Sequence, residues 1–220
     1  MYTLYFGNKN YSTWSLRAWV LMKAFDIPFE EHRITLYEPD SPERIRVHSP
    51  SGKVPCLRDG DTVVWDSLSI AEYLAERHPG MWPADAATRA WARSATAEMH
   101  SGYSELRNEF GMNLRIRQTR KPSPAVAGDI ARITELWREG RERFGRNGDF
   151  LCGAFGIVDA FYCPVVYRFQ SYGVMLDGAA AEYHRALLDL PAMREWAEGA
   201  ARETEHIPML DSTMAQAQQQ

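Results

Sequence analysis

All the strand-like sequence in this chain of 220 residues lies before Trp82, and the apolar patterns after that residue are helical. The runs 2–6, 29–36, 54–57 and 62–65 are short, rich in β-branched and aromatic residues, and bounded by turn formers, which is typical of buried strands. The pattern therefore divides the chain into an α/β part and an all-α part. The length fits either one large domain or two small ones.

Helical patterns alternate with the predicted strands in the first part. One covers 13–23, between the first two strands, and another covers 67–78, after a hairpin that turns at Asp59-Gly60. The first half should form a parallel pair through a right-handed crossover, and the second half should add an antiparallel hairpin and a covering helix. With one irregular helix between the halves, at 39–50, this is a thioredoxin-like plan.

The second part carries only helical patterns. Apolar residues recur at steps of three and four from Trp91 to Leu114, which predicts one face of a single long helix. Further helices are predicted at 126–137, 157–169, 179–190 and 193–201. The run 157–169 is apolar nearly all round, so that helix should be central and buried. We expect a thioredoxin-like domain at 1–80 and an all-helical domain at 87–220.

Composition argues against several classes of protein. A net charge of -4 does not favour a nucleic-acid partner, which usually needs a concentrated basic face. No apolar stretch approaches the ~20 residues of a membrane span. Cys56, Cys152 and Cys163 are odd in number and form no CxxC pair, which argues against a disulfide framework and against a zinc site. We therefore expect no metal, no nucleic acid, no membrane and a cytoplasmic location.

Four short motifs carry most of the functional information. They are Ser12-Thr13-Trp14-Ser15-Leu16-Arg17, Val54-Pro55, Asp66-Ser67 and Gly156-Ile157-Val158-Asp159. In this order and spacing they resemble the soluble glutathione transferase family over nearly the whole chain, and the Ser-x-x-Ser-x-Arg pattern is similar to that of its zeta-like bacterial branch. The resemblance implies a homodimer with glutathione as co-substrate and a small hydrophobic electrophile as second substrate.

The chemistry of such an enzyme begins with the thiol of glutathione. An ordinary thiol of pKa ~8.5 is only ~3% ionised at pH 7, and the thiolate is the nucleophile. A hydroxyl that donates a hydrogen bond to the sulfur favours the charged form. Ser12 lies at the predicted strand-to-helix turn and is our candidate catalytic residue, with Thr13 and Ser15 as competitors. The alternative is that Ser12 only caps the helix, and Ser15 could bond a backbone carbonyl of the preceding turn.

The resemblance also implies how glutathione would bind. The Val54-Pro55 peptide would be cis, so that the backbone of Val54 pairs with the cysteinyl part of the tripeptide; the alternative is an ordinary edge-strand proline. Ser67 would hold the γ-glutamyl carboxylate at a helix start, and Asp66 the neighbouring ammonium. The alternative for both is helix capping. Lys53 would reach the glycyl carboxylate, or serve only as a solvated loop charge.

The second substrate should lie between Trp14, which would also flank glutathione, and the long helix. The candidates to line that space are His100, Tyr103, Arg107 and Met112, and each could instead be a core or surface residue of the helix. Zeta enzymes that isomerise maleylacetoacetate carry a substrate-binding arginine late in the buried helix. The aligned position here is Ser171, and Arg168 lies one turn earlier.

Three functions fit these features. The first is conjugation of glutathione to small electrophiles, with a serine hydroxyl activating the thiolate. The second is a glutathione-dependent isomerase or dehalogenase on the same site, although Ser171 departs from the maleylacetoacetate pattern. The third is a catalytically silent binding module, against which the complete set of site residues argues. None of the cysteines should be needed, because none lies at a helix start where its thiol pKa would fall.

Overall fold

The computed structural model describes residues 1–208 and 210–211 of the chain. Its strands are β1 (Tyr2–Phe6), β2 (Phe29–Arg33), β3 (Cys56–Asp59) and β4 (Thr62–Trp65). They form one sheet in the order β2-β1-β3-β4, in which β1 and β2 are parallel and the other neighbours are antiparallel. This is the predicted parallel pair followed by a hairpin. The second strand is shorter than the expected 29–36, since β2 ends at Arg33.

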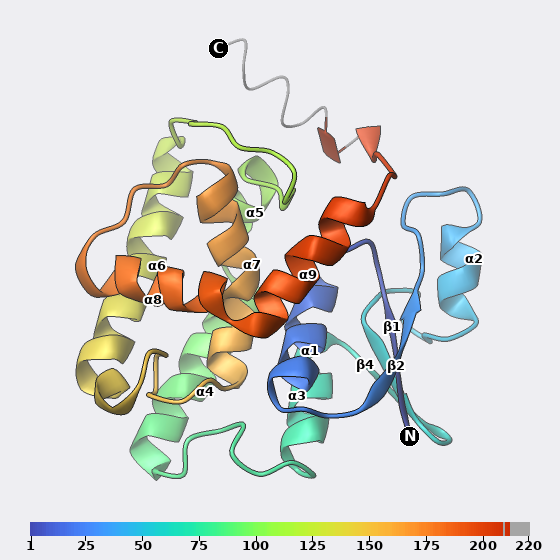
Figure 1. Cartoon of the computed structure of the whole chain (residues 1–220), viewed down its shortest axis with the longest axis horizontal. Helices are drawn as coiled ribbons and strands as arrows, with labels where there is room; N and C mark the ends of the chain where they lie inside the picture. Colours follow the sequence, from blue (N-terminus) through green and yellow to red (C-terminus); the bar gives the residue numbers. More distant parts are fainter. Residues whose placement is uncertain (209, 212–220) are drawn as a thin grey trace.

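Three helices complete the α/β region. They are α1 (Thr13–Ala24), α2 (Ser41–Arg46) and α3 (Ser67–Ala75). Figure 1 shows α1 and α3 between the sheet and the remaining helices, with α2 on the opposite side. The period-2 alternation of β1 explains this arrangement, because Leu4 and Phe6 enter the main core whereas Tyr5 packs with Ile45 of α2 on the other face.

The helical region follows. It contains α4 (Ala86–Ser101), α5 (Ser104–Glu109), α6 (Pro124–Arg143), α7 (Ile157–Ser171), α8 (Gly178–Asp189), α9 (Pro191–Arg202) and a short 3-10 turn at Gly145–Asn147. Every residue of α7 except Gln170 is buried, which confirms the predicted central helix. The fold class is therefore a thioredoxin-like α/β region with a helical C-terminal region. The exact domain limits, 1–80 and 87–220, stay a prediction.

The expectation of one long helix from Trp91 to Leu114 is wrong. The chain breaks at Gly102 and Tyr103, where Tyr103 adopts a left-handed backbone with φ of 59°. The side chain of Arg107 then turns back and donates to the carbonyls of Met99 and His100, two of the acceptors left free at the end of α4. A side chain thus supplies the hydrogen bonds that a continuing helix would have made.

The start of α7 depends on a close backbone approach. The carbonyl of Met81 accepts the amide of Ile157, and a Cβ on Gly156 would lie 2.7 Å from that oxygen, which explains why this position is a glycine. Asp159, which is fully buried, accepts from the amides of Leu151 and Gly156 and from the Tyr183 hydroxyl. Three donors therefore satisfy this buried carboxylate at the start of α7.

No helix formed by residues 1–208 and 210–211 has the combination of length and apolar character that crossing a bilayer requires.

Candidate functional site

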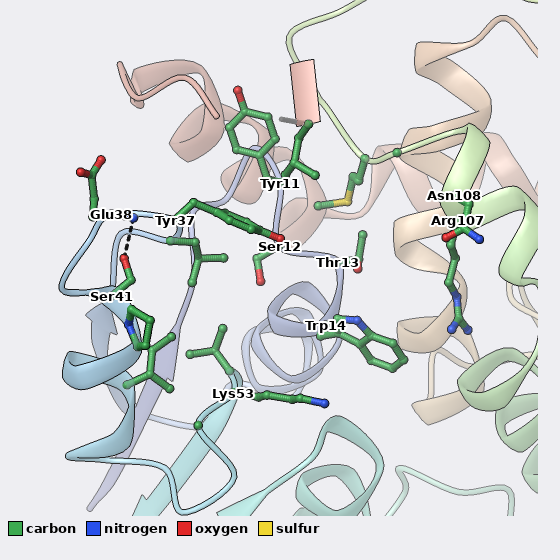
Figure 2. Close-up of a pocket in the computed structure, with 18 of the residues that line it drawn as sticks. Tyr11, Ser12, Thr13, Trp14, Tyr37, Glu38, Ser41, Lys53, Arg107 and Asn108 are labelled. Atoms are coloured by element: carbon green, nitrogen blue, oxygen red, sulfur yellow. Dashed lines mark hydrogen bonds between the residues drawn. The ribbon is translucent and has the colours of Figure 1, made fainter. Parts of the chain in front are cut away.

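A cavity of about 650 Å³ lies where the strand-to-helix turn after β1 meets the helical region. It is lined by Tyr11, Ser12, Thr13, Trp14, Leu36, Tyr37, Glu38, Ser41, Pro42, Ile45, Gly52, Lys53, Val54, Arg107, Asn108, Gly111, Met112, Arg168 and Leu210. We call it the large cavity. Figure 2 shows Trp14 between Ser12 and Arg107, so the indole stands between the sheet side and the helical side of this space.

A second cavity, of about 430 Å³, adjoins the first and is called the small cavity. Its lining is Trp14, Ser51, Lys53, Val54, Pro55, Trp65, Asp66 and Ser67. All six residues that the sequence assigned to glutathione are therefore gathered around one space. Trp14, Lys53 and Val54 line both cavities, so a ligand in the small cavity would extend toward Ser12 in the large one.

Ser12 and Ser15 differ in access. Ser12 lines the large cavity, whereas Ser15 is fully buried and lines neither cavity. The Ser12 hydroxyl donates to the Ser15 hydroxyl over 2.7 Å, and the Ser15 oxygen also accepts the amide of Gly7 over 3.1 Å. The expected bond from Ser15 to a carbonyl of the preceding turn is replaced by these contacts. Ser12 precedes α1 but its side chain makes no capping hydrogen bond, so its oxygen is not committed to the helix.

The peptide bond between Val54 and Pro55 is cis, as the resemblance implied. Pro55 is buried and Val54 is half-buried, directly before β3. Lys53, one residue earlier, is exposed on the edge shared by the two cavities.

The turn into α3 shows that capping and ligand binding need not exclude each other. Asp66 accepts the amides of Leu68 and Ser69 through Oδ1, which makes it the N-cap. Its backbone φ is +72°, a conformation that costs free energy in a residue other than glycine and that clusters at ligand sites. Ser67 is only 1% exposed, and its hydroxyl has no hydrogen-bond partner among the described residues.

The structure brings only two of the four predicted second-substrate residues to the large cavity, Arg107 and Met112. Tyr103 instead turns into the core, where its hydroxyl donates to Glu98 and its pKa is raised by burial and by that carboxylate. His100 lies behind Trp14 and lines neither cavity. The position of Tyr103 follows from the break at Gly102, whereas His100 precedes the break and is held by its contacts with Trp14, Arg17 and Asp66.

Arg168 of α7 lines the large cavity, whereas Ser171 does not. The Ser171 hydroxyl donates to the carbonyl of Asn113. Arg168 donates to the carbonyls of Phe110 and Pro164, and burial lowers its pKa to about 10. The sequence carried a signal for Arg168, because an arginine in a helix that is otherwise nearly all apolar is seldom there for solvation.

Two further lining residues were not predicted. Tyr11, next to Ser12, donates its hydroxyl to the carboxylate of Asp211 and accepts from Arg115, which ties the described end of the chain to the rim of the cavity. Tyr37 is 60% exposed at the rim and has a left-handed backbone. Neither residue has a distinguishing pattern in the sequence, since only the tertiary contact gives it a place in the site.

None of the three cysteines lines either cavity, although Cys56 directly follows Pro55. Burial raises the pKa of Cys56 and of Cys163, and raises that of Cys152 to about 12, so the thiol forms are favoured in all three. Within residues 1–208 and 210–211, no group of three or more metal-ligating side chains is present.

Comparison with known proteins gives one family. Residues 11–77 match the family model described as the glutathione S-transferase N-terminal domain. A stringent starvation protein A homolog from Haemophilus ducreyi is 23% identical over 142 residues, which is 64% of this chain and 63% of that protein. The match therefore spans less than two thirds of that relative's length.

Solved structures show the same fold at low identity. A bacterial maleyl pyruvate isomerase, described as a zeta-class glutathione S-transferase, has a TM-score of 0.70 at 20% identity, covering 92% of this chain and 100% of that one. A Burkholderia glutathione transferase homolog with bound glutathione has a TM-score of 0.68 at 22% identity, covering 92% and 98%.

Proposed function

Because the chain belongs, through its N-terminal domain, to the soluble glutathione S-transferase family, we propose that it binds glutathione in the small cavity and transfers it to an electrophile in the large one. The observation that carries this proposal is the hydroxyl of Ser67, buried and unpartnered among the described residues at the start of α3. A buried polar atom without a partner costs free energy, which a ligand that bonds it would recover.

The charges around Ser67 suit the γ-glutamyl end of the tripeptide. The first amides of α3 and the Ser67 hydroxyl favour a carboxylate. Asp66 keeps Oδ2 for the adjacent ammonium, because its amide contacts use Oδ1. The other end, the glycyl carboxylate, would meet Lys53. The two ends of the tripeptide thus face groups of opposite charge.

Ser12 would then face the sulfur. Its hydroxyl proton now points to Ser15, and a rotation about the side chain would donate it to a thiolate instead, while Ser15 keeps the amide of Gly7. The thiol loses its proton to solvent, the sulfur forms a bond to the electrophilic carbon, and the leaving group departs with its electron pair. The Ser12 hydroxyl stabilises the thiolate and is not itself consumed.

The test is calorimetry with glutathione, followed by turnover of 1-chloro-2,4-dinitrobenzene. Ser67→Ala should weaken glutathione binding about tenfold, since a hydrogen bond to a charged group is worth ~1.5–3 kcal/mol. Ser69→Ala is the matched control, because it removes a hydroxyl two positions later in the same helix turn, outside the lining. Binding without turnover would favour a silent binding module, and no binding at all would contradict the proposal.

A glutathione-dependent isomerase acting on an acidic substrate is the second candidate. It is favoured by Arg107 and Arg168, two guanidinium groups on the wall of the large cavity whose hydrogen bonds within the described residues are to backbone carbonyls. A solved neighbour of this fold is named maleyl pyruvate isomerase. A dehalogenase would use the same thiolate. The homodimer and the cytoplasmic location stay predictions.

A further inference from the structure

His100 of α4 connects the helical region to two residues that line the small cavity, Trp14 and Asp66, and to Arg17 of α1. Its Nδ1 lies 3.4 Å from Nη1 of Arg17 in α1, and its Nε2 lies 3.4 Å from Oδ2 of Asp66. The ring meets Trp14 edge-on, with 5.4 Å between the ring centroids. His100 therefore contacts three residues of the α/β region while lining neither cavity itself.

Arg17 determines where the imidazole carries its proton. A guanidinium group has donors only, so Nδ1 of His100 must be the acceptor in that contact. A neutral imidazole then has its hydrogen on Nε2, which faces Asp66. Arg17 is only 2% exposed, and its Nε has no partner among the described residues. The buried cation is thus held on His100 and on the ring faces of Trp14 and Phe161.

On balance, the surroundings of His100 lower its pKa and so disfavour protonation of the ring. Burial lowers its pKa below the ordinary value, Asp66 raises it, and Arg17 and Arg107 lower it further. These charged groups come from α1, from the start of α3 and from α5, and the uncharged Phe161 of α7 packs against the ring. At neutral pH the imidazole is uncharged and donates toward Asp66.

The two oxygens of the Asp66 carboxylate have different neighbours. Oδ1 caps α3, and Oδ2 is left for a ligand but lies next to His100. We propose that His100 is a positioning residue, which holds Oδ2 of Asp66 in place for the ammonium of glutathione when neutral and competes with that ammonium when protonated. This inference rests on the glutathione site proposed above.

The experiment uses S-methylglutathione, which has no titrating thiol, and measures its Kd by calorimetry between pH 8 and pH 4.5. The Kd of the wild type should rise roughly fivefold as pH falls through the pKa of His100, since an imidazolium would pair with Asp66. His100→Gln should stay within about twofold, because the amide still donates to Asp66 but does not titrate. His78→Gln, the same change at a histidine outside both linings, should behave like the wild type.

Two results would overturn the inference: a wild-type Kd that does not change with pH, or the same rise in His100→Gln. Should the wild type bind no S-methylglutathione at any pH, the proposed function fails, and the His100 contact is decided separately. For that purpose the ring proton of His100 is titrated by NMR without ligand, in the wild type and in Asp66→Asn, which keeps the capping oxygen. Loss of the carboxylate should lower the pKa of His100, and an unchanged titration would refute the contact.

Discussion

The two walls of the large cavity are held in different ways. On the α/β side, Ser12 stands at the start of α1, in the connection from β1, and Val54 stands just before β3, so elements of the thioredoxin-like region fix where they point. On the helical side, Arg107 and Arg168 are long side chains that reach the cavity only because backbone carbonyls from other turns anchor them. The α/β wall is therefore suited to one constant ligand, and the helical wall can change its ligand through few substitutions.

The largest expected effect is a loss of stability in the helical region, at the start of α7. Asp159→Ala leaves the amides of Leu151 and Gly156 and the hydroxyl of Tyr183 without an acceptor in the core. Each such group costs ~1–3 kcal/mol, so the free energy of unfolding should fall by about 3 kcal/mol or more. Urea denaturation followed by tryptophan fluorescence measures it, and a loss below about 1 kcal/mol would show that α7 does not depend on this carboxylate.

The second effect concerns the α/β wall alone. Asp66→Ala with Ser67→Ala should weaken glutathione binding by more than ~2 kcal/mol, about 30-fold, because two charge-assisted contacts are lost. Because Asp66 also caps α3, circular dichroism must show that the double variant is folded. Unchanged affinity by calorimetry in a folded protein would end the proposed glutathione site.

The third prediction separates two hydroxyls in the same wall. Ser12→Ala should raise the pKa of bound glutathione and cut kcat/KM about tenfold, or ~1.4 kcal/mol. Ser15→Ala should cost less than half that free energy, because Ser15 lines neither cavity and reaches a ligand only through Ser12. Thiolate absorbance against pH decides between them. A shifted titration in Ser15→Ala but not in Ser12→Ala would reverse the assignment.

The difference between the walls also explains what the sequence could predict. Ser12, Pro55 and Ser67 belong to short motifs at element ends, where a local pattern determines the backbone, and all three line the expected cavities. The parallel pair, the hairpin and the buried helix were likewise predictable, from the connections between strands, the Asp-Gly turn and the apolar run of 157–169. The sequence cannot prove what these residues bind, so their roles stay proposals.

The helical wall was predicted less well, for a physical reason. The apolar spacing continues through Gly102, so periodicity alone indicates one helix, although the chain turns there and Tyr103 enters the core. The packing of α7 against α1 and α4 decides which side of α7 faces the cavity. As a result Arg168 lines the cavity and Ser171 does not. The local pattern marks Arg168 as unusual in an apolar helix, but it does not show which side of α7 packs against the other helices.

The fourth prediction tests whether the helical wall selects charge. Arg168→Gln should lower kcat/KM roughly fivefold for 4-chloro-3-nitrobenzoate and less than twofold for its methyl ester. Solvent in an open cavity weakens the attraction between the guanidinium and the substrate carboxylate but does not abolish it. Arg117→Gln is the matched control, because Arg117 pairs with Gln170 outside the cavity. An equal loss with acid and ester would mean that Arg168 supports the wall without recognising a carboxylate.

The smallest effect is expected behind the α/β wall, at Cys56 in β3. This thiol is buried and donates to the carbonyl of His48, a contact that a serine hydroxyl can also make. Because burial raises its pKa, the reactive thiolate is disfavoured. Cys56→Ser should therefore keep kcat/KM within about twofold and lose only roughly 1 kcal/mol of stability. A folded variant without activity would show that a cysteine, and not the turn hydroxyl of Ser12, supplies the chemistry of this thioredoxin-like sheet.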